Sequence, residues 1–497
     1  MDLNWILIWE ICYSMLLVVV CLKVVYDTGS NSKALAYLFA VIFLPILGMV
    51  FYFSFGTSYR KRKIYSRKLL ADDSQSSKLE NAIQQKARNV IAGGNAVVQA
   101  HKGIARLLVK ENLSPLTGNN QVELLLNGEK KFPKVLEALK AAKHHIHLEY
   151  YIYEDDEIGK AIEEVLKQKA KQGVEVRLIY DDFGSRSIRK KLVPRLRACG
   201  VEAYPFYEII FLALANRLNY RNHRKLIVID GEIGFIGGIN VSDGYINAAS
   251  TGRKRRKWIK KGKRKLYWRD THVRLEGSAV HYLQHLFLCD WNFCAKQSIA
   301  PEEEYFPKLR ERRPGDKYVQ IAASGPDSDN PTILFALLQS IHLATKELLI
   351  TTPYFIPEQG IIDAIRIAAL SGVKVKLLVP GKSDSRIVNA AARSYYGELL
   401  DAGVDIYLYQ KGFVHAKTVV VDKGLTVIGS ANMDYRSFDL NFEANAIIYD
   451  EEFGEQMART FYTDLEGSIK IDAFLWEERH WYLKLLEKTV RLIAPLL

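Results

Sequence analysis

The stretch that decides the fold reads His-Arg-Lys-Leu-Ile-Val-Ile-Asp at positions 223–230 and occurs again as His-Ala-Lys-Thr-Val-Val-Val-Asp at positions 415–422. Two small residues and an asparagine follow each copy, and the interval from histidine to asparagine is 17 residues both times (240 − 223 and 432 − 415). A single His-x-Lys on a strand is usually a pair of exposed side chains without a function. Two copies with a matching aspartate, small pair and asparagine indicate a duplicated functional unit.

Each copy predicts a hairpin that gathers its polar residues in one place. Histidine and lysine, two apart on a strand, point to the same face, and the apolar run behind them buries the strand. Asp-Gly or Asp-Lys-Gly then turns the chain, so that the returning strand sets Asn240 or Asn432 beside the pair. The two imidazoles, two ammonium groups and two amides suit a phosphodiester. Lysine and asparagine would hold the non-bridging oxygens, while one imidazole attacks phosphorus and the other protonates the leaving oxygen.

The repeat extends beyond this motif. Residues 173–180 (Gly-Val-Glu-Val-Arg-Leu-Ile-Tyr) match residues 372–379 (Gly-Val-Lys-Val-Lys-Leu-Leu-Val) at an offset of 199 (372 − 173). Amphipathic helices are predicted over 161–172 and 361–371, before these short strands. The alternation predicts an α/β sandwich in each half of the chain, with the two halves facing each other across a pseudo-two-fold axis and a site at the seam.

The N-terminal 59 residues predict a transmembrane hairpin. Apolar stretches at 5–25 and 34–55 are each close to the ~20 residues that cross a bilayer as a helix. A basic run follows the second stretch, and the positive-inside rule places that end and the rest of the chain in the cytoplasm. A secretory signal peptide or a pair of buried core helices are the alternatives.

The expected domain order is therefore hairpin 1–59, basic juxtamembrane segment and linker 60–120, first half 121–312 with motif 223–230, and second half 313–497 with motif 415–422.

The charge of the chain favours an anionic partner. Lys and Arg number 69 against 56 acids, which gives +13, and residues 253–265 hold ten basic side chains in thirteen. The partner is an acidic membrane surface or nucleic acid, unless the charge serves solubility alone. The basic run is either an anchor for acidic headgroups or a solvated loop. The apolar segment 207–215 either dips into a bilayer or is an ordinary buried helix.

The duplicated H-x-K-x4-D motif resembles the phospholipase D superfamily. Residues 217–225, 268–277 and 324–327 are further similar to bacterial cardiolipin synthases, and the resemblance covers essentially the whole chain. It implies the double α/β sandwich, a covalent phosphatidyl-histidine intermediate, and no metal or other cofactor.

The resemblance also implies roles for residues. His223 becomes the nucleophile and His415 the acid and base, while Lys225 and Lys417 neutralise developing charge. The catalytic motif includes two aspartates, which would orient it rather than touch substrate: Asp230 and Asp422.

A carboxylate is expected behind each histidine in this superfamily. The candidates for this role and for substrate contact, beside Asn240 and Asn432, are Asp270, Glu443 and Glu149. Glu149 has the alternative of an ordinary acid at the end of a strand.

The reaction implied is transfer of a phosphatidyl group from one phosphatidylglycerol to another, giving cardiolipin and glycerol. The expected location is the bacterial cytoplasmic (inner) membrane, as a multi-pass protein with its catalytic domain on the cytoplasmic side. A phospholipase D hydrolase that releases phosphatidate is the first alternative, and a nuclease, favoured only by the charge, is the second. No nucleic-acid partner is expected, and the oligomeric state is left open.

Overall fold

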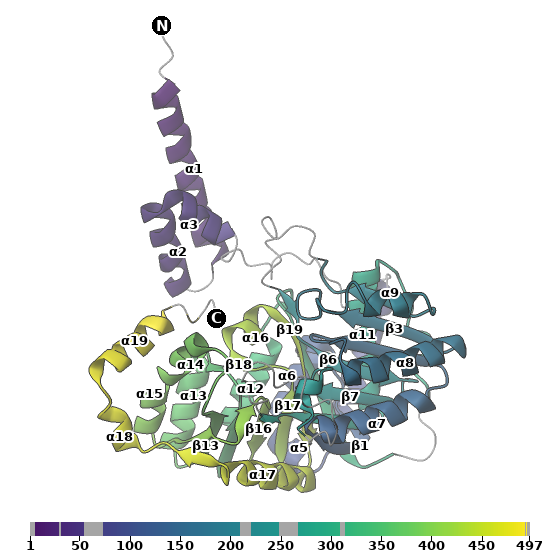
Figure 1. Ribbon diagram of the computed structural model, residues 1–497. Helices are drawn as coiled ribbons and strands as arrows, with labels where there is room; N and C mark the ends of the chain where they lie inside the picture. Colours follow the sequence, from purple (N-terminus) through teal and green to yellow (C-terminus); the bar gives the residue numbers. More distant parts are fainter. Residues whose placement is uncertain are drawn as a thin grey trace, which may run out of the picture.

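The computed structural model describes residues 5–28, 31–53, 73–208, 220–247, 267–308, 314–492 and 494 (Figure 1). Three predicted features lie outside these residues: the basic juxtamembrane run at 60–68, the basic run at 253–265, and most of the apolar segment at 207–215.

A 16-stranded sheet runs through both halves of the molecule, and one half repeats the strand order of the other. From the centre outward, the first half has β1 (Thr117–Leu126), β9 (Thr271–Glu276), β7 (Ile233–Gly237), β6 (Lys225–Ile229), β2 (His145–Tyr150), β3 (Glu175–Tyr180) and β4 (Glu202–Pro205). The second half has β10 (Lys317–Ser324), β19 (Asn441–Tyr449), β17 (Leu425–Gly429), β16 (Thr418–Val421), β11 (Glu347–Thr351), β13 (Lys374–Pro380), β14 (Asp405–Tyr409) and β20 (Ser468–Lys470).

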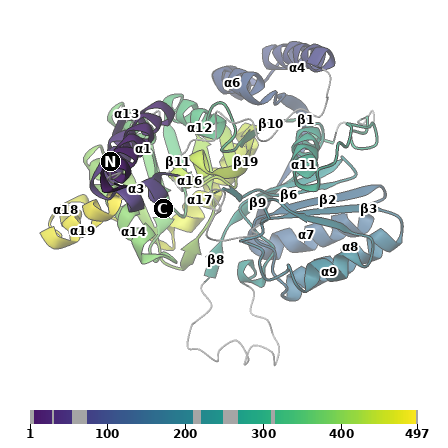
Figure 2. The same cartoon turned by 90° about the horizontal axis from the view of Figure 1, so that it is seen from above.

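The two halves meet at an antiparallel pairing of their first strands, β1 and β10, in which Thr117 lies opposite Val319. Figure 2 shows the halves side by side with these strands between them. The duplicated α/β architecture is confirmed, and the pseudo-two-fold relation takes the form of one continuous sheet.

Helices cover both faces of this sheet. One face carries α7 (Asn127–Ala141), α8 (Glu157–Lys171) and α9 (Leu192–Arg197), with their equivalents α12 (Thr332–His342), α13 (Gln359–Leu370) and α15 (Tyr396–Asp401) in the second half. The other face carries α11 (Ala279–Ala295) and α17 (Glu451–Leu465). The core beneath α11 and α17 includes strands of both halves, so the burial of apolar side chains binds the halves together.

The segment before β1 is folded. It forms α4 (Asp73–Ala92), α5 (Ala96–Ala100) and α6 (Lys102–Asn112). Ile104 and Leu108, four apart on α6, are fully buried in the core of the second half. Part of the expected linker therefore belongs to the second half's packing, because its apolar residues recur at helical spacing.

Two pairs of short strands join the halves near the site, and a third pair lies within the second half. β5 (Arg221–Asn222) of the first half pairs with β19, and β8 (Tyr267–Arg269) of the first half pairs with β15 (Gly412–Val414) of the second. A third pair joins β12 (Phe355–Ile356) to β18 (Met433–Asp434), after which come α16 (Tyr435–Asp439) and the strand β19. These pairings position the chain on either side of both histidine motifs.

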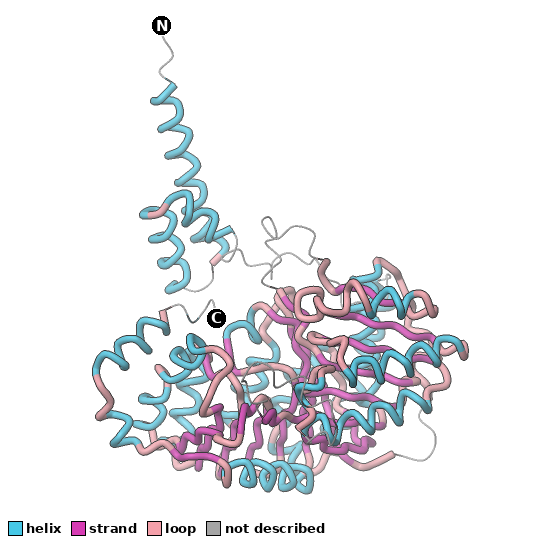
Figure 3. The backbone as a smooth tube through the Cα atoms, viewed as in Figure 1, coloured by secondary structure: helices cyan, strands magenta, loops and turns pink. Residues whose placement is uncertain are grey.

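The N-terminal helices differ from the expected hairpin. Among the described residues, only α1 (Trp5–Asp27) is long and apolar enough to cross a membrane. The second apolar stretch breaks at Leu44, before Pro45, where proline removes a helical hydrogen bond. It forms α2 (Asn31–Phe43) and α3 (Pro45–Phe51), separated by the short loop visible in Figure 3.

These two helices pack side by side. A Cβ on Gly48 would lie 2.1 Å from the carbonyl oxygen of Ala40, so glycine allows the chain to fold back on itself. At 1.5 Å per residue, α2 and α3 extend for only about 20 Å and about 10 Å, short of a bilayer core of about 30 Å. The second crossing is therefore not confirmed.

Candidate active site

Each motif histidine is held in place by a strand of the opposite half. The backbone N–H of His223 donates to the carbonyl of Phe442 on β19, at 2.9 Å. The backbone N–H of His415 donates to the carbonyl of Arg269 on β8, at 2.7 Å. The two motifs are therefore positioned by contacts between halves as well as by their own hairpins, β6–β7 and β16–β17.

The carboxylates cross between the halves in the same way. Glu443 of the second half lies 2.8 Å from Nδ1 of His223, and Asp270 of the first half lies 2.7 Å from Nδ1 of His415. Both acids are fully buried. A proton on Nδ1 donated to the carboxylate leaves Nε2 of each ring free for reaction.

The buried site keeps the imidazoles neutral and the carboxylates ionised. Burial lowers the pKa of His223 and of His415 to about 4, although the carboxylate beside each ring acts in the opposite direction. Burial opposes ionisation of Glu443, but its contacts with His223, Lys225 and Ser430 outweigh this and lower its pKa to about 2. A neutral imidazole beside an ionised carboxylate is the state needed for nucleophilic attack.

The two lysines are buried beside the histidines. Nζ of Lys225 donates to the carbonyl of His223 at 2.5 Å, and Nζ of Lys417 lies 2.8 Å from Nδ1 of His415. Burial lowers the pKa of Lys225 to about 7 and that of Lys417 to about 8. Their charge is therefore sensitive to pH near neutrality and is stabilised by an anion entering the site.

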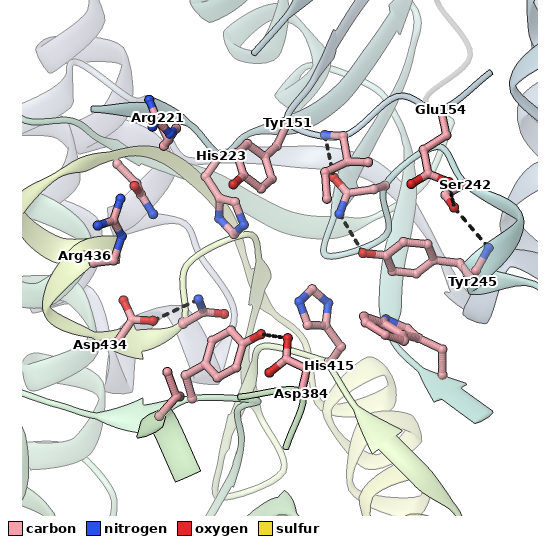
Figure 4. Close-up of a pocket in the computed structure, with 18 of the residues that line it drawn as sticks. Tyr151, Glu154, Arg221, His223, Ser242, Tyr245, Asp384, His415, Asp434 and Arg436 are labelled. Atoms are coloured by element: carbon pink, nitrogen blue, oxygen red, sulfur yellow. Dashed lines mark hydrogen bonds between the residues drawn. The ribbon is translucent and has the colours of Figure 1, made fainter. Parts of the chain in front are cut away.

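Both histidines line one cavity of about 510 Å³, in which Figure 4 shows the two rings facing each other. Asn240 and Asn432 also line it. Asn240 donates to the Tyr245 hydroxyl at 2.6 Å. Asn432 donates to Asp434 at 3.0 Å, while its buried Oδ1 has no hydrogen-bond partner among the described residues. The predicted imidazoles and amides thus converge on one space.

The cavity walls are unlike on the two sides. Around His415 lie the rings of Trp268, Tyr245 and Tyr354, at centroid distances of 5.3, 6.1 and 6.4 Å. On the His223 side lie the Tyr151 ring, with its centroid 4.9 Å from that of His223, and the side chains of Arg221 and Arg436 (Figure 4).

Burial lowers the pKa of Arg221, as does the charge of Arg436, while Asp181 acts in the opposite direction. Two guanidinium groups in one cavity wall are suited to bind an anion.

Three predicted site residues neither line the cavity nor hydrogen-bond to a motif histidine. Asp230 accepts hydrogen bonds from the backbone N–H groups of residues 143–145, and Asp422 from those of residues 345–347. Both aspartates have positive φ, 53° and 49°, at the hairpin turns. They hold the starts of β2 and β11 and do not line the cavity, and the orienting role that the resemblance implies for them remains a prediction.

Glu149 is likewise outside the cavity wall. It is fully buried, accepts a hydrogen bond from Asn222 at 2.6 Å and lies 3.9 Å from Arg224. Burial and the nearby Asp290 raise its pKa well above the usual value. Glu149 lies on β2, whose residues are all buried. In the sequence, a charged residue on such a strand looks like a residue of an active site.

Other cavity residues were not predicted: Tyr151, Glu154, Arg221, Tyr245, Tyr354, Asp384, Asp434 and Arg436. Tyr151 and Tyr354 each come just after equivalent strands of the two repeats, β2 and β11, which is a signal the sequence does contain. Arg436 and Asp384 reach the cavity only through tertiary packing.

Two histidine–asparagine pairs around one cavity, each histidine beside a buried lysine and a buried carboxylate on a duplicated α/β sheet, define a phosphodiester-exchange site of the phospholipase D type. The comparisons with known proteins narrow this class. The family described as "Cardiolipin synthase, PLD-like domain" matches residues 135–249 and 337–465, and the family described as "Phospholipase_D-nuclease N-terminal" matches residues 14–56.

The cardiolipin synthase of Alkalihalophilus pseudofirmus is 38% identical over 98% of this chain and 93% of its own length. The major cardiolipin synthase ClsA of Bacillus subtilis is 38% identical over 94% of each chain. The chain therefore belongs to the cardiolipin synthase family. Among solved structures, phosphatidylserine synthase of Haemophilus influenzae shares the fold, with a TM-score of 0.56 and 16% identity over 79% of this chain and 98% of that one.

Proposed function

We propose that this protein is a membrane-associated cardiolipin synthase that transfers a phosphatidyl group from one phosphatidylglycerol to a second, releasing glycerol. The observation that carries the exchange chemistry is the convergence of His223 and His415 on one cavity, each with Nδ1 held by a buried carboxylate.

In the first step, Nε2 of His223 attacks the phosphorus of the donor. The P–N bond forms as the P–O bond to glycerol breaks, and His415 gives its Nε2 proton to the departing oxygen. The charge of the bound phosphate favours the protonated form of His415, whose Nδ1–H remains on Asp270. Lys225 and Lys417 offset the charge that develops on the non-bridging oxygens.

In the second step, a glycerol hydroxyl of the acceptor enters where the first glycerol left. His415, now neutral, takes the hydroxyl proton, the oxygen attacks phosphorus, and the P–N bond to His223 breaks. One phosphodiester replaces another, so the bonds balance without a nucleotide.

The arginine wall favours transfer over hydrolysis. A lipid acceptor brings its own phosphate, and water does not. Arg221 and Arg436 line the same cavity as the two histidines. We assign this pair to the phosphate of the acceptor lipid, which would compete with water for the phosphohistidine.

Lipid product analysis by mass spectrometry, with phosphatidylglycerol as sole substrate, tests the proposal. We expect cardiolipin and glycerol from the wild type. Phosphatidate without cardiolipin would support the hydrolase, and cleavage of DNA without lipid turnover would support the nuclease.

Replacing Arg221 or Arg436 by Gln should raise the ratio of phosphatidate to cardiolipin by about tenfold, a loss of one charge-assisted contact. Arg459→Gln, on the surface of α17 with its side chain 71% exposed, is the matched control and should leave the ratio unchanged. An unchanged ratio in both cavity variants would remove the arginines from acceptor binding.

For location, we propose a bacterial inner-membrane protein whose α/β body lies on the cytoplasmic side. Support comes from the apolar α1 and from the basic residues at 60–68, which the positive-inside rule assigns to the cytoplasm. The multi-pass hairpin remains a prediction. The fold-back of α2 and α3 favours one crossing, with the N-terminus on the opposite side from the body.

A further inference from the structure

The last two helices of the described chain have an inverted polarity. They are α18 (Ala473–Glu477) and α19 (Trp481–Arg491), at the edge of the second half. On a helix that packs against a soluble protein, the apolar side faces the core and the polar side faces water. Of the residues of α19, all of which the structure describes, the one that is buried is an acid, Glu487.

Ion pairs hold the polar side of α19 against the protein. Glu487 accepts from Arg393 of α14 (Arg386–Arg393) at 2.9 Å and from both terminal nitrogens of Arg479 at 2.9 and 3.1 Å. Arg491 donates to Glu398 of α15 at 2.9 Å. These charge-assisted bonds fix the rotation of the helix about its own axis.

The opposite side of α19 is a large apolar surface. Its exposed side chains include Trp481, Tyr482, Leu485 and Leu486, which are between 54% and 73% exposed. They are joined by Leu492, just after the helix, at 81%, and by Phe474 and Leu475 of α18 at 69% and 64%. Trp476 of α18, by contrast, is buried under Arg393 and Arg479. A patch of this kind on a well-anchored helix marks an interaction surface.

The position of this surface links it to both the membrane segment and the active site. α19 lies on the side of the body nearest the N-terminal helices, as Figures 1 and 2 both show. It packs on α14, whose Val388 lines the catalytic cavity. A bilayer that holds α1 is therefore also within reach of α19, and α14 connects that contact to the cavity.

We propose that residues 473–492 form an interfacial segment that inserts its apolar face into the surface of an anionic phospholipid bilayer and so holds the cavity at the membrane. Tryptophan, tyrosine and leucine on one side with lysine and arginine at the edges are the composition of such helices. Lys488, exposed on α19, and the +13 charge of the chain complement acidic headgroups. Beside α1, the segment is a second contact with the membrane. This inference rests on the proposed function and adds to it a surface that controls how lipid reaches the active site.

A double variant, Leu485→Glu with Leu486→Glu, tests this without touching the buried face. Both side chains are more than half exposed, so the fold should be kept. Ile367→Glu with Leu370→Glu is the matched control. These residues are 55% and 68% exposed and belong to a different helix, α13, far from α19 in the sequence.

The direct readout is quenching of Trp481 by brominated phosphatidylglycerol in vesicles carrying the full-length protein. The contribution of Trp481 is the difference between the wild type and Trp481→Phe. We expect Trp481 to be quenched in the wild type and the control variant, and quenching to be lost in L485E/L486E. An unquenched Trp481 in the wild type would overturn the proposal.

Turnover separates surface docking from catalysis. On vesicles, L485E/L486E should need at least tenfold more phosphatidylglycerol in the surface for half-maximal rate, while turnover of dispersed short-chain phosphatidylglycerol stays within twofold of the wild type. If the wild type does not turn over the short-chain lipid at all, the proposed function fails, but the fluorescence readout still decides the docking.

A second copy of the chain is the competing occupant of this face. Light scattering of the detergent-purified protein should then show a dimer that L485E/L486E dissociates. That outcome, together with an unquenched Trp481, would replace the membrane by a dimer interface.

Discussion

The two halves of the active site carry the same motif in different surroundings. His223 and His415 have the same carboxylate partnership, with distances of 2.8 and 2.7 Å, and their pKa values are both lowered to about 4. Several rings surround His415, among them Trp268 and Tyr245, whereas His223 has the Tyr151 ring at 4.9 Å and arginines on its side. The duplication therefore supplies similar groups at phosphorus. We expect the residues that differ to give the halves unequal roles.

The largest effect should come from removing either imidazole. His223→Ala and His415→Ala should each lower lipid turnover by on the order of 10⁴-fold or more, because the nucleophile and the acid act as a unit. A phosphatidyl ester of p-nitrophenol separates the two roles, because this leaving group needs no proton.

With that ester, H415A should still release a burst of nitrophenol and trap radiolabelled phosphohistidine, and H223A should not. Trapping in H223A alone would reverse the assignment of the nucleophile.

The crossed carboxylates should give the next largest effect. Glu443→Gln and Asp270→Asn keep the shape but lose the charge that orients and stabilises each imidazole, so kcat should fall by about 10²-fold to 10⁴-fold. With the p-nitrophenol ester, whose leaving group needs no proton, we expect E443Q to slow phosphohistidine formation and D270N to leave it nearly unchanged, whereas both variants should slow it with phosphatidylglycerol. Equal effects of both variants with both substrates would show that the halves do not divide the work.

The pKa values of the two buried lysines predict how kcat/KM depends on pH. The pKa values of Lys225 and Lys417 are about 7 and 8, so the charged forms are lost as pH rises through this range. The nucleophile is neutral above about pH 4. Because His415, the acid of the first step, also has a lowered pKa of about 4, kcat/KM should decline gradually above that pH and fall more steeply above about pH 7, where the lysines lose their charge.

Lys225→Arg keeps its charge at every relevant pH and should move this fall from about 7 toward the pKa of Lys417, about 8. An alkaline limb unchanged by both Lys225→Arg and Lys417→Arg would mean that another group titrates.

The smallest effect on catalysis should come from the motif aspartates. Asp230→Ala and Asp422→Ala each leave backbone N–H groups without their acceptor, which should cost about 1–3 kcal/mol of stability. Activity per folded molecule should stay within tenfold of that of the wild type. Burial acts to raise the pKa of Asp422, but hydrogen bonds from residues 345–347 outweigh it and lower this pKa. The contribution of the Asp422 carboxylate to stability is therefore present at neutral pH and is lost as pH falls through that lowered value.

Thermal unfolding followed by circular dichroism, beside kcat, measures this difference. Asp363→Ala, on the exposed part of α13, is the control for a surface aspartate. Loss of activity with an unchanged Tm would return both motif aspartates to the catalytic set.

Much of the fold follows from local pattern. The repeat, its strand–helix alternation and the two hairpins are visible in the sequence because burial imposes a period on residues close together in the chain. The positions of His223, Lys225 and Asn240 follow from the same hairpin geometry. The second apolar stretch shows the limit: its composition is that of a spanning helix, but Pro45 interrupts the helix and Gly48 lets it fold back on α2.

The sequence by itself determined the duplicated phosphodiester motif and the family resemblance, because both depend on residue types at fixed short spacings. Only the tertiary structure decided that Glu443 serves His223 and Asp270 serves His415, since each pair joins residues from opposite halves, 220 and 145 positions apart. It also decided that Glu149 lies in the core, and that α19 turns its leucines outward. A side chain's role in such cases depends on which face of its element is covered, and that is set by contacts between segments distant in the chain.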